Sequence, residues 1–64
     1  MDKKTIAETC RALAENSLNV REAAESIYIH RNTMVIRAQK IKEITGLDPL
    51  KCYDLCELLK MGEA

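Results

Sequence analysis

The sequence lacks tryptophan and phenylalanine and contains only one proline and two glycines among its 64 residues. Because its aromatic residues are two tyrosines and its β-branched runs are few, a β-sheet has little support. Hydrophobic residues make up 47% and charged residues 31% of the chain, a balance typical of an ordered helical protein. We therefore predict one all-α domain that spans residues 1–64.

Long apolar segments are also missing. No run approaches the roughly 18 apolar residues of a membrane span, and the charged start MDKKTIAETC lacks the apolar stretch of a secretory signal. A chain this short buries only about 60% of the surface that it exposes when unfolded, and it has too few residues to form the walls of a deep pocket. No nucleophile–base pair or phosphate-binding glycine loop is visible. We expect a cytoplasmic, nucleoid-associated protein that is not an enzyme. It should need no cofactor and should bind neither a membrane nor a small-molecule substrate.

Disulfide and metal chemistry have little support either. The cysteines Cys10, Cys52 and Cys56 are odd in number and form no C-x-x-C pair, so they are expected on core faces as small hydrophobes. The only histidine, His30, has no second ligand at a suitable spacing, which favours a capping or phosphate-contacting role. Both tyrosines are expected to pack their rings against the core with the hydroxyls outward.

Apolar spacing predicts four helices, over about residues 3–15, 20–27, 31–45 and 49–61. Asn19 can cap the start of the second helix, and Gly46 can end the third in a left-handed conformation. The fourth helix is predicted to begin with Asp48 as N-cap and Pro49 at its first position. It is expected to bury Cys52, Leu55, Cys56 and Leu59. The predicted core consists of Ile6, Leu13, Ala24, Ile27, Ile29, Met34, Ile41, Leu55 and Leu59.

The second and third predicted helices are separated by about three residues, as in a helix-turn-helix motif. Ala23 and Ala24 in the second helix are small enough to let the two helices cross closely, whereas larger side chains would hold them apart. The expected architecture is therefore a small four-helix domain that contains a helix-turn-helix.

Positive charge is concentrated in one segment, although the net charge of the chain is zero. From Ser26 to Lys42 there is no acidic residue, while Arg31, Arg37 and Lys40 all fall in this segment. Such a local basic face attracts a polyanion even when the total charge is zero. The basic run is also compatible with a merely solvated helix face.

The third helix supplies the candidate DNA contacts. If Met34 points inward, the opposite face carries hydrogen-bonding and apolar groups that match base edges in the DNA major groove, and the helix N-terminus favours a phosphate. Arg31, Asn32 and Thr33 are predicted to touch base edges or adjoining phosphates, with Val35, Ile36 and Gln39 on the groove side. Arg21, Arg37 and Lys40 are predicted to hold the DNA backbone, with Asn19 and His30 near phosphates. The rival hypothesis is a protein-interaction or dimerisation module that uses the exposed Val35 and Ile36.

The segment REAAESIYIHRNTMVIRAQKIKEITGLD resembles the C-terminal helix-turn-helix domain of PucR/CdaR-type bacterial regulators and is similar, more loosely, to Fis-type domains. The shared elements are the paired alanines, an apolar residue before HRNT, Arg37, and IKEITGLD, over roughly residues 16–59. The resemblance implies sequence-specific binding to promoter DNA, as a homodimer on a symmetric site or as part of a larger regulator. The matched positions of the recognition helix are His30, Arg31, Asn32, Thr33 and Arg37.

The sequence departs from the family pattern at three positions. Val35 and Ile36 stand where the family commonly has a basic residue and an aromatic one, and Ala38 stands where leucine is usual. Loss of a basic residue removes one phosphate or base contact, so we expect a lower affinity or an operator richer in thymine. Ala38 places a smaller side chain than leucine beneath the third helix.

Overall fold

The computed structural model describes the backbone of residues 1–63 and the side chains of residues 1–61. Within this part of the chain lie four helices: α1 (Lys3–Glu15), α2 (Val20–Ser26), α3 (Arg31–Thr45) and α4 (Cys52–Glu63). The prediction of an all-α four-helix domain is confirmed. The predicted domain also included residue 64, which lies outside the described residues.

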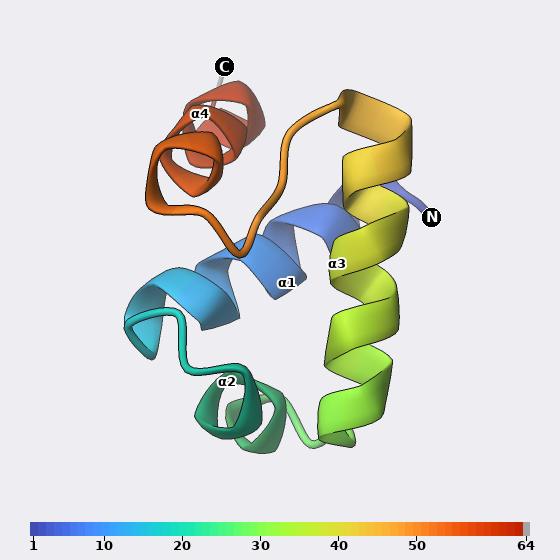
Figure 1. Ribbon diagram of the computed structural model, residues 1–64, viewed down its shortest axis with the longest axis vertical. Helices are drawn as coiled ribbons and strands as arrows, with labels where there is room; N and C mark the ends of the chain where they lie inside the picture. Colours follow the sequence, from blue (N-terminus) through green and yellow to red (C-terminus); the bar gives the residue numbers. More distant parts are fainter. Residues whose placement is uncertain (64) are drawn as a thin grey trace.

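Helix α1 crosses the middle of the molecule and packs against each of the other three helices (Figure 1). Helix α3 stands along one side, and α2 and α4 lie near its two opposite ends (Figure 1). Among the described residues, α4 packs against α1 but makes no helix–helix contact with α2 or α3. No helix in residues 1–63 is both long enough and apolar enough to span a membrane.

The core lies where the helices converge on α1. Of the predicted core residues, Leu13, Ala24, Met34, Ile41 and Leu55 are buried. The other four, Ile6, Ile27, Ile29 and Leu59, are partly exposed and pack against this buried cluster. The core is therefore formed largely by the predicted positions. The paired alanines of α2 are 0% and 1% exposed, and α2 packs closely against α3, as expected for small residues at a helix crossing.

The end of α2 forms a Schellman motif, a hydrogen-bonded termination in which one residue takes a left-handed conformation. The N–H of Ile29 donates to the carbonyl oxygen of Ala24 at 3.0 Å, and that of Tyr28 donates to Glu25 at 3.2 Å. This pattern holds Tyr28 at φ 59°, in a position that usually carries glycine. A left-handed conformation costs a non-glycine residue about 1–2 kcal/mol.

The tyrosine side chains do not pack against the core. Tyr28 is 96% exposed and Tyr53 is 90% exposed, so the prediction that their rings are buried was wrong. For Tyr28 the physical reason is its place in the turn, where the left-handed backbone directs the chain sharply from α2 into α3.

Helix α4 begins at Cys52, later than predicted, because the preceding residues form a separate turn. The N–H of Lys51 donates to the carbonyl oxygen of Asp48, and Oδ1 of Asp48 accepts the N–H two residues further along. Asp54, from inside α4, accepts the N–H of Asp48 at 3.0 Å. Asp48 therefore caps the turn and not the helix, which corrects the predicted start.

The buried stripe of α4 also differs from the prediction. Leu55 and Leu58 are buried, whereas Cys52 and Cys56 are exposed, so their predicted place in the core was wrong. Leucine removes more apolar surface from water than cysteine does, and burying the Leu55–Leu58 side of the helix is therefore favoured. Cys10 on α1 is buried as expected.

The three thiols should consequently differ in reactivity. Burial raises the pKa of the Cys10 thiol, and only the thiolate form is nucleophilic. We expect iodoacetamide to modify Cys52 and Cys56 of the folded protein well before Cys10, as measured by mass spectrometry of the digested protein. In denaturant all three should react at similar rates. Equal rates in the folded protein would contradict the burial of Cys10.

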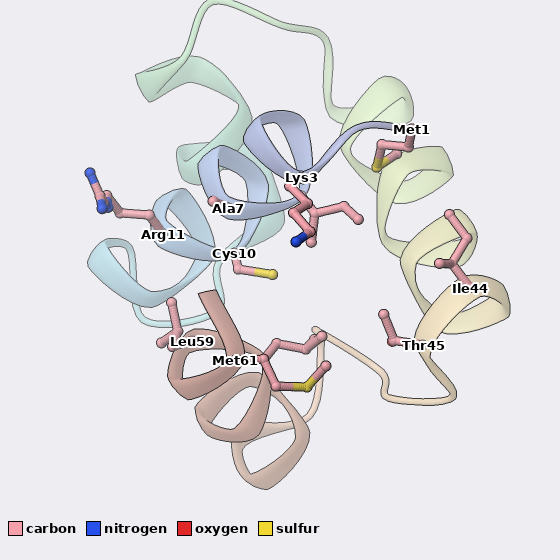
Figure 2. A pocket seen from close by; sticks show the side chains of 11 residues that line it. Met1, Lys3, Ala7, Cys10, Arg11, Ile44, Thr45, Leu59 and Met61 are labelled. Atoms are coloured by element: carbon pink, nitrogen blue, oxygen red, sulfur yellow. The ribbon is translucent and has the colours of Figure 1, made fainter. Parts of the chain in front are cut away.

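An apolar groove of about 470 Å³ lies between α1, α4 and the C-terminal end of α3 (Figure 2). Its lining includes Ile6, Cys10, Ile44, Leu58 and Met61. Ile44 and Met61 are 58% and 57% exposed at its rim. Because Ile44 is near the end of α3, the groove lies at the opposite end of that helix from the predicted DNA contacts.

Candidate nucleic-acid interface

Helix α3 presents one face to the core and the opposite face to solvent. Its buried residues are Met34, Ala38 and Ile41, which confirms the inward orientation expected for Met34. The exposed predicted residues of this helix are Arg31, Asn32, Thr33, Val35, Ile36, Gln39 and Lys40. At about 100° per residue, Asn32, Ile36 and Gln39 lie close to the direction opposite Met34.

The first turn of α3 is capped by the side chain of His30, one of the predicted DNA-contacting residues. Nδ1 of His30 accepts a hydrogen bond from the N–H of Asn32 at 3.0 Å. Since Nδ1 acts as the acceptor, the neutral ring carries its proton on Nε2. The His30 side chain is exposed, so this Nε2–H group is available as a hydrogen-bond donor beside the start of the helix.

Arg37 occupies a different environment from the other basic residues of α3. Its Nη1 donates a hydrogen bond to Oε1 of Glu8 on α1 at 3.0 Å, and its side chain is only 23% exposed. The pair connects α3 to the central helix. Contact of Arg37 with the DNA backbone stays a prediction, and it would require the guanidinium to leave or share Glu8. The sequence offered no signal for this pair, because the two residues are 29 positions apart.

Within residues 1–61, the remaining basic residues of α3 have no carboxylate partner. Among residues 1–61, no ion pair involves Arg31, Lys40 or Lys42. All three are exposed. The exposed side of α3 from its start to Lys42 is therefore positively charged, as the absence of acids in the sequence predicted, and the first acid on the helix is Glu43.

Helix α2 is more mixed in charge. Oδ1 of Asn19 accepts the N–H of Glu22, so this side chain caps the helix as predicted. Arg21 lies 3.5 Å from Glu25 in an exposed pair, and such surface pairs contribute only about 0–1 kcal/mol. Arg21 can therefore exchange its partner for a phosphate at little cost, although Glu22 and Glu25 reduce the positive potential of α2. The candidate surface is thus centred on α3.

Two apolar side chains lie within this polar surface. Val35 is 45% exposed and Ile36 is 56% exposed. Tyr28, which was not among the predicted contacts, is also exposed at the turn that leads into α3. No group of three His, Cys, Asp or Glu side chains within the described residues is arranged to hold a metal ion.

Residues 6–59 match the family model of the PucR C-terminal helix-turn-helix domain. The chain belongs to this family. The match extends from α1 into α4 and includes the whole helix-turn-helix. It confirms the resemblance seen in the sequence and identifies the fold as that of a DNA-binding transcription-regulator domain. No curated protein and no solved structure gives a significant match to the chain.

Proposed function

We propose that this PucR-type domain binds double-stranded DNA in a sequence-specific manner, as the DNA-binding part of a transcription regulator. The N-terminal half of α3 would lie in the major groove. The observation that carries the proposal is the exposed surface of α3, which bears no acid before Glu43. The opposite side of α3 packs against α2, where the buried Ala23 and Ala24 allow a close approach.

The chemistry of this surface suits base edges. Arg31 can donate two hydrogen bonds to a guanine, and Asn32 or Gln39 can form a paired contact with an adenine. Val35 and Ile36 can contact thymine methyl groups. An apolar pair exposed among polar groups therefore favours sites that contain thymine.

The groups at the edges of the surface suit the DNA backbone. Lys40 and Arg21 can each neutralise a phosphate, and Nε2–H of His30 can donate a hydrogen bond to another. Thr33, in the exposed first turn, can contact a phosphate through its hydroxyl. These contacts would orient α3 without adding sequence information.

A single helix reads only one half-site, so we propose that two copies bind a symmetric operator as a homodimer. The half-sites would lie one turn of DNA apart, about 34–36 Å from centre to centre. The domain would then act on the bacterial chromosome, in the cytoplasm.

Salt dependence tests this function. With about two neutralised phosphates for each of the two copies, at Lys40 and Arg21, the logarithm of affinity should fall with the logarithm of salt concentration at a slope of about −3.6. The measurement is fluorescence anisotropy of labelled duplexes selected from a random pool. A protein-interaction surface formed by Val35 and Ile36 would show little salt dependence and no preference among duplexes, and that result would contradict the proposal.

A further inference from the structure

Tyr28 occupies a position where the backbone favours a different residue. It is the left-handed residue of the Schellman motif that ends α2, with φ 59°. Glycine adopts this conformation without steric cost, and asparagine tolerates it better than an aromatic residue does. On backbone grounds alone, tyrosine is an unfavourable choice here.

The side chain of Tyr28 gives the fold no compensating burial. It is 96% exposed, so almost none of its ring is removed from water and the core gains little from it. Its hydroxyl is not hydrogen-bonded to any side chain or backbone group within the described residues. A strained residue that does not stabilise the fold points to a function outside it.

The position of Tyr28 in the chain suggests what that function is. Tyr28 lies two residues before His30, the N-cap of α3, and three before the exposed Arg31. The connection from α2 enters α3 at the end that carries these residues (Figure 1). Tyr28 therefore lies at the same end of α3 as the residues proposed to enter the groove, with its side chain exposed.

We propose that Tyr28 contacts DNA and that its hydroxyl donates a hydrogen bond to a backbone phosphate at the edge of the groove that α3 enters. This inference rests on the proposed function. Tyrosine hydroxyls are suitable phosphate donors. Because the phenol is neutral, its contact adds affinity for every sequence alike and releases no counterion.

The test compares Tyr28→Phe and Tyr28→Gly with Tyr53→Phe, which removes a hydroxyl from a similarly exposed tyrosine on α4. Tyr28→Phe should weaken duplex binding about tenfold, the value of one hydrogen bond to a charged group. The melting temperature and the slope of affinity against salt should stay unchanged. Tyr28→Gly should weaken binding at least as much, yet raise the melting temperature by about 4 °C. Tyr53→Phe should change neither property.

The outcomes separate this inference from the proposed function. If the unmodified domain binds duplex DNA and Tyr28→Phe binds equally well, the inference fails and the proposed function stands. A loss confined to one operator sequence would likewise overturn the assignment to phosphate. If the unmodified domain binds no duplex at any salt concentration, the proposed function fails and Tyr28 has no DNA to contact.

Discussion

Replacing Met34 by alanine is expected to lower the free energy of unfolding by about 2–5 kcal/mol. Met34 is 0% exposed and belongs to the buried cluster that joins α3 to the rest of the core. The substitution removes three heavy atoms of the side chain from a closely packed interior. The loss of stability is the sum of their transfer free energy and the cost of the cavity that they leave. In a domain of only 64 residues, this is a large part of the total stability.

The measurement is urea unfolding followed by far-UV circular dichroism. Met61→Ala is a matched control, since the same atoms are removed from a side chain that is 57% exposed on α4. The control should change stability by no more than about 0.5 kcal/mol. Similar losses for both variants would mean that Met34 does not anchor α3 in the core.

Arg31→Ala is expected to weaken binding to the selected operator by about 1–3 kcal/mol, the usual contribution of a bidentate contact with guanine. The side chain is exposed and forms no ion pair among residues 1–61. Its removal should therefore leave the melting temperature almost unchanged. Binding is measured by anisotropy on the operator and on a duplex of scrambled sequence, and the loss should be larger on the operator.

Arg11→Ala serves as the control for charge. Arg11 is an exposed arginine on α1 whose side chain points away from α3 (Figure 2). The two variants lose the same charge, so a comparable loss of binding would indicate a general electrostatic effect. An equal loss for Arg31→Ala on both duplexes would assign Arg31 to a phosphate. Unchanged binding of the Arg31→Ala variant would show that the start of α3 is not part of the interface.

Much of the candidate surface could be predicted because it depends on one helix. Once Met34 is placed inward, the period of the helix sets which side chains face away from it. Val35 and Ile36 are exposed as that period requires. The exception is Arg37, on the flank of α3, whose partner Glu8 comes from a helix that no local pattern relates to it.

The positions of the first three helices follow from local chemistry in the chain. Asn19 caps α2 through its side chain, and Gly46 ends α3 with φ 79°, because each residue satisfies backbone groups near it in sequence. The amino-acid sequence also determines that α3 carries basic and amide side chains and that its first three turns contain no acidic residue.

The start of α4 and the choice of its buried face depend on packing against α1. Residues 52–61 contain two overlapping apolar stripes, one with Cys52 and Cys56 and one with Leu58, and both share Leu55. Periodicity cannot choose between them, since each has helical spacing. The choice follows from the larger apolar area of leucine and from the turn around Asp48, which fixes where the helix begins and how it meets α1.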